Sequence, residues 1–219
     1  MSAEHKKDLV NNFGIPAGKI IILRNWVSPE FKVTQKAEKR DIDVLFVGRL
    51  ELQKNLFLFI DVIAKLAEIF PSLCVHVVGP GSQSQALKEY AIKNGLKDII
   101  SFNGYQDDPS GYYQRAKTFL LTSMFEGQPL ALLEAMKMGV PAVTFYYEGV
   151  ETVIKHNLNG FIAGNIPEAV SEISSLLSSK KKWQRISNNC RKVVMKEYSA
   201  KQLDRFMSEI GCYGWKILA

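Results

Sequence analysis

Short apolar runs alternate with helix-like segments from residue 42 onward, and this alternation is the strongest constraint on the fold. The strand-like runs are Ile42–Val47, Leu73–Val78, Ile99–Phe102, Thr118–Thr122, Ala142–Phe145 and Gly160–Ala163. Helical patterns cover Leu56–Phe70, Ser84–Asn94, Pro109–Arg115, Pro129–Met138 and Pro167–Leu177. Strands that alternate with helices form a parallel sheet covered on both faces. The sequence therefore predicts a doubly wound α/β domain.

The two ends of the chain follow a different pattern. The predicted features there are a helix over Ala3–Phe13 closed by Gly14, a strand over Lys19–Leu23, a polar linker over Lys32–Arg40 and a polar helix around Trp183–Tyr198. A final helix carries Leu203, Phe206, Met207 and Ile210 at helical spacing, which gives it one apolar face. We therefore expect terminal helices outside the sheet domain.

The composition is that of an ordinary globular chain. Of the 219 residues, 47% are hydrophobic and 23% are charged, which is enough apolar material for a full core. The 28 Lys and Arg exceed the 22 Asp and Glu, and the resulting charge of +6 is spread along the chain. Such a balance favours anionic small molecules or a membrane surface over nucleic acid.

Cysteine usage and hydropathy indicate the compartment. Cys74, Cys190 and Cys212 are odd in number and form no C-x-x-C pair, as expected in a reducing environment. No apolar run approaches the ~18 residues of a membrane helix, and the opening residues MSAEHKKDLV lack the apolar region of a signal peptide. We therefore expect a cytoplasmic chain whose membrane contact is at most peripheral, at the inner face.

Ligands of open α/β sheets bind beyond the carboxyl ends of the strands, so the loops after the predicted strands are the candidate site. Arg49 and Lys54 in the first loop suit a diphosphate, because Arg binds phosphate as a fork and Lys as a point charge. Two ordinary surface cations are the alternative. Gly79-Pro80-Gly81 allows close backbone approach to a ligand or is a simple turn, and Phe102–Tyr105 suits a base or is likewise a turn.

Two carboxylates flank the start of one predicted helix. Glu134 lies among apolar residues, and an ionised carboxylate is rarely buried without hydrogen-bond donors. Glu126 lies eight residues earlier and begins a turn through Gly127 and Gln128, after which Pro129 suits the first helical position. Unpaired backbone N–H groups at such a helix start can receive an anion.

Spacing excludes several other motifs. The stretch from Gly79 to Ser84 lacks the third glycine of a dinucleotide fingerprint, and the stretch from Gly14 to Lys19 lacks the spacing of a phosphate loop. Asp41-x-Asp43 lies at the amino end of a predicted strand, opposite the edge where a ligand is expected. His5, His76 and His156 lack the spacing of metal ligands. We expect neither a metal ion nor a cofactor.

The segments VGRLELQKN, HVVGPG, SFNGY and FEGQPLALLEAMKMGVPAV follow one another in an order and spacing that resembles the family 4 glycosyltransferases of the GT-B fold. The resemblance covers about residues 39–195 and implies the family's Rossmann-like, nucleotide-sugar-binding C-terminal domain. Glu126 and Glu134 match its E-x(7)-E pattern. Residues 1–38 resemble the end of the family's first, acceptor-binding domain, and residues 196–219 resemble its crossover helix.

The resemblance implies a role for each matching residue. Arg49 and Lys54 hold the donor diphosphate, Glu134 accepts the ribose hydroxyls and Glu126 lies by the sugar. Arg49, Lys54 and Glu126 are the implied catalytic residues. The implied binding residues are Gly48, Gly79, Gly81, Phe102, Asn103, Gly104, Tyr105, Gly127, Gln128, Pro129, Leu130 and Glu134. Gln128 stands where the family often has Phe, and Asn55 where it commonly has Gly.

The implied function is transfer of a sugar, with retention, from a UDP-, GDP- or ADP-sugar to a glycan or lipid-linked acceptor. The sequence resembles only the end of the family's acceptor-binding domain, so two alternatives to this function stay open. One is a non-catalytic nucleotide-sugar-binding fragment that needs a partner subunit with the missing half. The other is a nucleotide-sugar epimerase, which shares the GT-B architecture. A glycosidase is a remote third, since its paired acids need no adjoining phosphate-type loop.

Overall fold

The centre of the molecule is a six-stranded parallel sheet. The computed structural model describes residues 3–20, 25–28, 31 and 40–209. The strand order is β3-β2-β1-β4-β5-β6, and every neighbouring pair is parallel. The strands are β1 (Ile42–Val47), β2 (Val75–Val78), β3 (Ile100–Phe102), β4 (Ala116–Leu121), β5 (Ala142–Phe145) and β6 (Gly160–Ala163). The predicted parallel sheet of six strands is confirmed, and β1, β5 and β6 have the predicted bounds.

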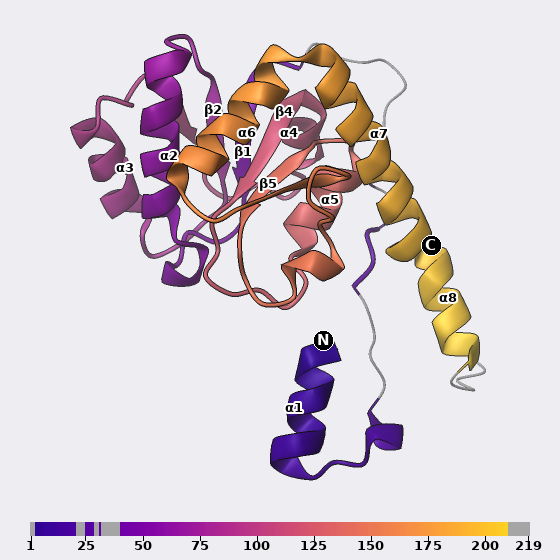
Figure 1. The fold of residues 1–219 in the computed structure, drawn as a ribbon. Coiled ribbons are helices and arrows are strands. Elements are labelled where there is room, and N and C mark those ends of the chain that lie inside the picture. The colour runs from indigo at the N-terminus through magenta and orange to yellow at the C-terminus, as the bar shows by residue number, and fades with distance from the viewer. Residues whose placement is uncertain (1–2, 21–24, 29–30, 32–39, 210–219) are drawn as a thin grey trace.

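Helices cover both faces of the sheet (Figure 1). On one face lie α2 (Leu56–Ile69), α3 (Ser84–Lys93) and α6 (Ile166–Ser178); on the other lie α4 (Ser110–Arg115), α5 (Leu130–Lys137) and α7 (Lys180–Glu197). The central strands are therefore enclosed on both sides, and Val44, Leu45 and Phe46 of β1 are fully buried. This enclosure explains why the strands appear in the sequence as continuous apolar runs. The predicted doubly wound arrangement is confirmed.

The chain first adds strands on one side of β1 and, after β3, returns to add them on the other side, so the strand order reverses between the neighbouring strands β1 and β4. β2 and β3 extend the sheet on one side of β1, whereas β4 pairs with the other side, with Val44 opposite Thr118. The loops that follow β1 and β4 therefore diverge from the same edge, and ligands of doubly wound sheets bind in the crevice between such loops. We refer to this place, formed by residues 48–55 and 122–129, as the switch point.

One guanidinium group joins the C-terminal ends of α4 and α5. Arg40 donates to the carbonyl oxygens of Tyr113 at 3.0 Å, of Met138 at 2.9 Å and of Ala116, and it lies 5.1 Å from the ring centroid of Trp183. Helix C-terminal carbonyls carry partial negative charge, so they stabilise this cation. Burial, with repulsion from Arg191 as a smaller cause, lowers the pKa of Arg40 to about 10. The contact fixes α4 against α5.

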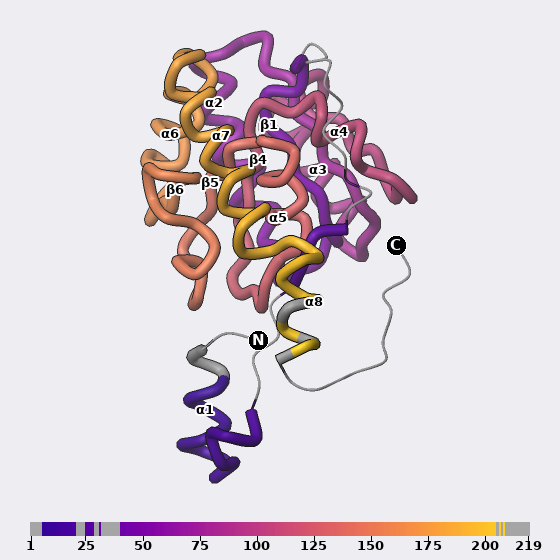
Figure 2. The backbone as a smooth tube through the Cα atoms, turned by 90° about the vertical axis from the view of Figure 1, so that its right-hand side faces the viewer, coloured from indigo at the N-terminus to yellow at the C-terminus, as the bar shows by residue number. Residues whose placement is uncertain are grey.

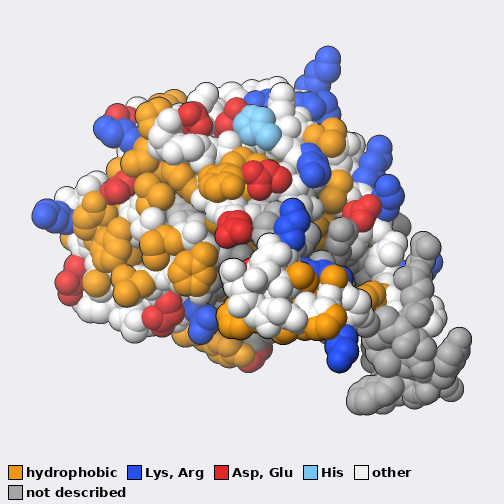
Figure 3. Space-filling view, turned by 60° about the horizontal axis from the view of Figure 1, so that its bottom comes forward, with side chains coloured by type: hydrophobic (Ala, Val, Ile, Leu, Met, Phe, Trp, Pro, Cys, Tyr) orange, Lys and Arg blue, Asp and Glu red, His pale blue; other side chains and the backbone are white. Residues whose placement is uncertain are grey.

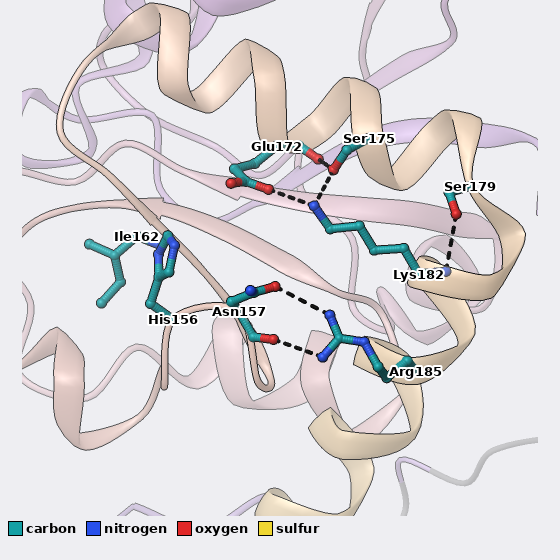
Figure 4. A network of polar contacts seen from close by, with 8 residues as sticks. All are labelled: His156, Asn157, Ile162, Glu172, Ser175, Ser179, Lys182 and Arg185. Carbon is teal, nitrogen blue, oxygen red and sulfur yellow. Dashed lines mark hydrogen bonds and ion pairs between the residues drawn. The ribbon is translucent and has the colours of Figure 1, made fainter.

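A polar network fastens the turn before β6 to the corner between α6 and α7 (Figure 4). Arg185 donates to the backbone and side-chain oxygens of Asn157 at 3.0 and 3.2 Å, and Asn157 has a φ of 62°. Lys182 contacts Glu172 at 2.9 Å and Ser175 at 2.6 Å. The network lies at the β6 edge of the sheet, away from the switch point, and its bonds are internal. We assign it a structural role.

The terminal helices lie outside the sheet layers, on the same side of them (Figures 1 and 2). Helix α1 spans Ala3–Phe13 and ends at Gly14, whose φ is 65°, as predicted. Helix α8 spans Ala200–Glu209. In α8, Leu203 is buried and Phe206 is half-buried, consistent with the predicted apolar face, while Ile210 lies outside the described residues. Because α7 continues to Glu197, the predicted domain boundary after residue 195 falls in its last turn.

The predicted strand over Lys19–Leu23 is wrong at its first residue. Lys19 lies in the 3-10 helix η1 (Ala17–Lys19), where its N–H donates to the carbonyl of Pro16 at 2.8 Å. The proline fixes φ and favours a turn, which here outweighs the apolar residues that follow. The residues from Ile21 to Leu23, and residues 32–39 of the predicted linker, lie outside the described residues.

Asn55 adopts a left-handed conformation, with φ 49° and ψ 51°, between the 3-10 helix η2 (Leu52–Lys54) and α2. Asparagine and glycine tolerate this region better than other residues. We expect Asn55→Gly to change the free energy of unfolding by less than about 0.5 kcal/mol, and Asn55→Ala to lower it by about 1 kcal/mol. Urea denaturation of both variants measures the difference.

Asn94→Ala is the matched control, because Asn94 ends α3 with a φ of −91°, outside the left-handed region. We expect it to cost less than Asn55→Ala. An equal loss for the glycine and alanine variants of Asn55 would show that the amide group, and not the backbone angle, is what the position requires.

Candidate functional site

Lys54 and Glu126 meet at the switch point. Lys54 Nζ lies 2.5 Å from Glu126 Oε1, and Ser123 Oγ donates to the same oxygen at 2.7 Å. The exposed fractions of the Lys54 and Glu126 side chains are 15% and 7%. Because both side chains are largely removed from solvent, each charge depends on the other for stabilisation. The sequence predicted both charged residues at this site, but it did not indicate that they pair or that Ser123 takes part.

Backbone contacts hold the two loops of the switch point together. The N–H of Met124 donates to the carbonyl of Gln53 at 2.9 Å, and Gln53 Nε2 donates to the carbonyl of Phe125 at 2.8 Å. Thr122 Oγ1 donates to the carbonyl of Lys54 at 2.8 Å. These bonds fix the backbone around Lys54, so its ammonium group has a defined position relative to Glu126.

Gly79 and Gly81 are required by the packing of neighbouring loops. A Cβ atom at Gly79 would lie 2.0 Å from the carbonyl oxygen of Gly48, and one at Gly81 would lie 2.3 Å from that of Leu50. The close backbone approach seen in the structure is therefore to the loop after β1. The predicted contacts of Gly48, Gly79 and Gly81 with a ligand stay predictions.

Arg49 is an exposed cation in the loop after β1. Its side chain is exposed and makes no ion pair with any residue that the structure describes. The nearby Glu51 carboxylate accepts hydrogen bonds from the N–H and the hydroxyl of Ser82, at 2.9 and 2.7 Å. Those bonds lower the pKa of Glu51, and the charge of Arg49 lowers it further. Arg49 is thus a cation without an ion-pair partner among the described residues, and its predicted contact with a diphosphate stays a prediction.

Helix α5 starts at this crevice without a side-chain cap. Pro129 is its N-cap residue, with φ −68° and ψ 112°, and Leu130 is the first helical residue. The prediction that Pro129 would occupy the first helical position is therefore wrong by one residue, and proline has no N–H to donate. Among the described residues, no capping side chain accepts a hydrogen bond from the N–H groups of Leu130 and its successors in the first turn, an arrangement that suits an anion.

Gln128 is committed to a contact inside the protein. Its Oε1 accepts from the N–H of Asn25 at 2.6 Å, and its carbonyl accepts from Asn25 Nδ2 at 2.7 Å. The two bonds attach the loop before α5 to the segment at residues 25–28. The sequence predicted a ligand contact for Gln128 and gave no indication of Asn25, which lies 103 positions away. The exposed Gly127 beside it has open space around its Cα.

Among the described residues, Glu134 has one hydrogen-bond donor. The hydroxyl of Tyr113 on α4 donates to Glu134 Oε2 at 2.8 Å. Tyr113 is fully buried and Glu134 is half-buried. Burial raises the pKa of Glu134 and the hydrogen bond from Tyr113 lowers it, with burial the larger cause. The sequence predicted the need for a donor but not Tyr113, because no periodicity links two residues on different helices.

The loop after β5 brings an unpaired hydroxyl near the ion pair. Tyr147 is 3% exposed, and its buried hydroxyl has no hydrogen-bond partner among the described residues. Burial, followed by the charge of Glu126, raises the pKa of Tyr147 far above its ordinary value. No sequence pattern indicated a role for this loop.

The predicted base-binding loop lies farther along the same edge. Tyr105 is 67% exposed, and the carbonyl of Gly104 accepts from the N–H of Gly79 at 2.7 Å. Asn103 Oδ1 lies 2.8 Å from His76 Nδ1, so this amide is already engaged. Because β3 is two strands from β1, the end of β3 at Phe102 lies about 10 Å from the end of β1. A ligand that touches both loops must extend along the edge.

Apolar side chains surround the switch point. Leu52, Met124, Phe125 and Tyr146 are each more than half exposed. Figure 3 views the molecule from the side on which α1 and α8 lie and shows broad apolar areas between acidic and basic side chains. Exposed apolar patches of this kind are typical of surfaces that contact another molecule.

Two negative findings concern the part of the chain that the structure describes. It contains no group of three or more His, Cys, Asp or Glu side chains arranged to hold a metal ion. None of its helices has both the length and the apolar character needed to span a bilayer.

Comparison with known proteins gives one family. The model of the family described as Glycosyl transferases group 1 matches residues 27–193. An uncharacterized glycosyltransferase of Haemophilus influenzae is 29% identical over 182 residues, which are 82% of this chain and 50% of that protein. The lipopolysaccharide 1,6-galactosyltransferase of Salmonella typhimurium is 30% identical over 188 residues, 81% of this chain and 52% of that protein. The chain thus spans about half the length of these curated relatives.

A solved structure shares the fold. A variant of S. aureus TarM, crystallised with fondaparinux, alpha-GlcNAc-glycerol and UDP, aligns with a TM-score of 0.87 and 22% identity. The alignment covers 96% of this chain and 43% of the TarM chain.

Removing one member of the Lys54–Glu126 pair should leave the other charge buried and alone. We expect Lys54→Met or Glu126→Gln to lower the free energy of unfolding by about 3 kcal/mol each, and the double variant to lose much less than the sum. Urea denaturation of the four proteins measures the coupling. Lys65→Met, in the exposed pair with Glu68 (60% and 64% exposed), is the control and should cost less than about 1 kcal/mol. Additive losses at Lys54 and Glu126 would contradict the pairing.

Glu134→Gln should leave the unliganded protein equally stable or more stable at neutral pH. The pKa of Glu134 is raised in the folded state, so the folded protein keeps a proton that the unfolded chain has released. Its contribution to stability therefore falls as pH rises from the unfolded pKa through the folded pKa. Denaturation between about pH 4 and 8 should show this fall in the wild type and not in the variant. A variant markedly less stable at neutral pH would refute the expectation.

Proposed function

The chain belongs to the Glycosyl transferases group 1 family, and on this premise we propose that it binds a nucleotide-sugar donor at the switch point. We propose further that the sugar is transferred, with retention, to a glycan or lipid-linked acceptor. The observation that carries the proposal is the meeting of Lys54 and Glu126 near the uncapped start of α5, with Arg49 exposed in the loop that also carries Lys54. Two cations and a helix N-terminus at one crevice match the negative charge of a diphosphate.

In the proposed reaction the bond between the anomeric carbon and the diphosphate oxygen breaks. The acceptor oxygen bonds to the anomeric carbon on the same face, and its proton passes to the leaving diphosphate. Negative charge therefore builds on the diphosphate, where Arg49, Lys54 and the first N–H groups of α5 stabilise it. The backbone around Lys54 and the start of α5 are already held in place in the unliganded protein. The scheme requires neither a metal ion nor a cofactor.

Glu126 has a second part in this scheme. While the crevice is empty it neutralises Lys54 at 2.5 Å. A bound diphosphate supplies Lys54 with another anion, which releases the Glu126 carboxylate to accept hydrogen bonds from sugar hydroxyls. Glu134, farther along α5, would accept the ribose hydroxyls, and the loop at Phe102–Tyr105 would face the base, with Asn103 and Gly104 in that loop. Gly127 and the N–H of Leu130 would lie against the sugar and phosphate.

The acceptor side of the reaction needs residues beyond this crevice. The exposed apolar side chains of Leu52, Met124 and Phe125 surround the crevice, and we propose that they face the acceptor or the protein segment that binds it. The Salmonella relative is named for a lipopolysaccharide, which supports a glycan or lipid-linked acceptor. We propose that the chain contacts the membrane peripherally, from the cytoplasm.

A second candidate is a nucleotide-sugar-binding fragment that acts with a partner subunit. The observation that favours it is the exposure of the apolar side chains of Leu52, Met124 and Phe125 at the crevice, which suits contact with another protein. Both candidates require the same donor site, so a nucleotide-binding measurement tests both of them. An assay of sugar transfer to an acceptor then distinguishes one from the other.

Calorimetric titration of the purified chain with UDP, GDP, ADP and the corresponding sugars tests the donor site. UDP comes first, because TarM, which shares the fold, was crystallised with it. We expect selective binding of one nucleotide, weakened about tenfold in Arg49→Met and in Glu134→Gln, because each variant removes a charge-assisted contact. Arg185→Met is the matched control, since Arg185 is exposed and bonded to Asn157 away from the crevice.

Equal binding of all nucleotides, or binding untouched by both variants, would refute the proposed donor site. Incubation with the nucleotide-sugar and with lipid-linked or glycan acceptors then measures transfer, and the anomeric configuration of the product tests retention. A changed sugar formed without an acceptor would instead indicate an epimerase. Donor binding without transfer would favour the fragment that needs a partner.

A further inference from the structure

Tyr113 and Glu134 form a pair in which only one carboxylate oxygen is used. Tyr113 donates to Oε2 at 2.8 Å, and no described residue donates to Oε1, which is not among the fully buried unpaired atoms and so is reached by solvent. We propose that Tyr113 is a positioning residue. It holds Glu134 through Oε2, so that Oε1 accepts hydrogen bonds from the ribose hydroxyls of the nucleotide-sugar. The inference rests on the proposed function, because it assigns the ribose to Glu134.

The position of the Tyr113 hydroxyl is set by contacts on several sides. The ring packs edge-on against Phe31, with centroids 6.1 Å apart, and at a tilt against Phe119, with centroids 6.3 Å apart. The carbonyl of Tyr113 accepts from Arg40 at 3.0 Å, and Arg40 also binds the C-terminal end of α5, the helix that carries Glu134. Donor and acceptor are therefore fixed to each other through both side chain and backbone.

The hydrogen bond from Tyr113 favours the ionised form of Glu134, whereas burial, the larger cause, raises the pKa of this carboxyl. Burial and the neighbouring Glu134 charge raise the pKa of Tyr113 well above its ordinary range, so its hydroxyl keeps its proton at physiological pH. That proton opposes the effect of burial on the pKa of Glu134, for which burial and Tyr113 are the two causes. A carboxylate that stays charged accepts stronger hydrogen bonds from ligand hydroxyls than a neutral acid does.

A positioning role makes a specific prediction about sugar recognition. If Tyr113 acts through Glu134 on the ribose, then Tyr113→Phe should weaken binding only for ligands that carry ribose hydroxyls. The probes are the nucleotide that binds best among UDP, GDP and ADP, and its 2′,3′-dideoxy form. We expect the wild type to prefer the ribonucleotide by about tenfold or more, and Tyr113→Phe to lose most of that preference while binding the dideoxy form as the wild type does.

Tyr112→Phe is the matched control, because Tyr112 is the adjacent residue of α4 and its ring faces His76, with centroids 5.7 Å apart. It should keep the wild-type preference. If Tyr113→Phe weakens both nucleotides equally, the hydroxyl has only a structural role and the inference is overturned. If the variant keeps the full preference, the inference is overturned while the donor site stands. If the wild type itself shows no preference, the role of Glu134 in the proposed function fails, and this inference fails with it.

A second measurement needs no ligand. The carboxyl ¹³C shift of Glu134, followed through a pH titration, reports its pKa in the wild type and in Tyr113→Phe. Loss of the hydroxyl removes the effect that lowers the pKa, so the titration of Glu134 should move to higher pH in the variant. An unchanged titration would show that Tyr113 does not govern the state of the carboxylate, which also overturns the inference. Thermal denaturation of both tyrosine variants verifies that they are folded.

Discussion

The pairing of β1 with β4 fixes the position of every group at the switch point. Because β2 continues the sheet on one side of β1 and β4 on the other, the loops after β1 and β4 diverge from neighbouring strand ends. The crevice between them is therefore a result of topology, and it exists whatever side chains it carries. Lys54 comes from one of these loops and Glu126 from the other, and the backbone bond from Met124 to Gln53 keeps the two loops together.

Charged groups inside this domain are stabilised in three different ways. Arg40 is bound by carbonyl groups at the ends of two helices, Lys54 and Glu126 neutralise each other, and Glu134 accepts one bond from a buried tyrosine. The first arrangement is complete within the protein and serves the packing of α4 against α5. The other two arrangements can still form further interactions, since Lys54 can bind a second anion and Glu134 has one oxygen without a described hydrogen-bond donor. Incomplete satisfaction of buried charge is characteristic of binding sites.

Sequence patterns predicted the helices and strands well where one local signal, such as an apolar run or a glycine, determined the structure. The buried strands were found because apolar runs of their length have few alternatives in an α/β chain, and α1 ends at Gly14 as its left-handed φ requires. Errors arose where two local signals competed. Pro16 imposed a turn where Lys19 was expected in a strand, and Pro129 became the cap of α5 instead of its first residue. Asn55, a departure from the pattern of the resembling family, is explained by a left-handed backbone that glycine or asparagine can adopt.

The sequence by itself determined the parallel sheet, the loops that meet at its carboxyl edge, and the presence of Arg49, Lys54, Glu126 and Glu134 in or after those loops. These are consequences of local periodicity, loop position and residue chemistry, which are properties of short segments. Only the tertiary structure decided which of these groups are partners. The ion pair of Lys54 with Glu126 joins residues 72 positions apart, and the bond from Tyr113 to Glu134 joins two helices, so neither leaves a periodic signal in the chain. Such pairings depend on strand order and helix packing, because those long-range contacts set the distances between side chains.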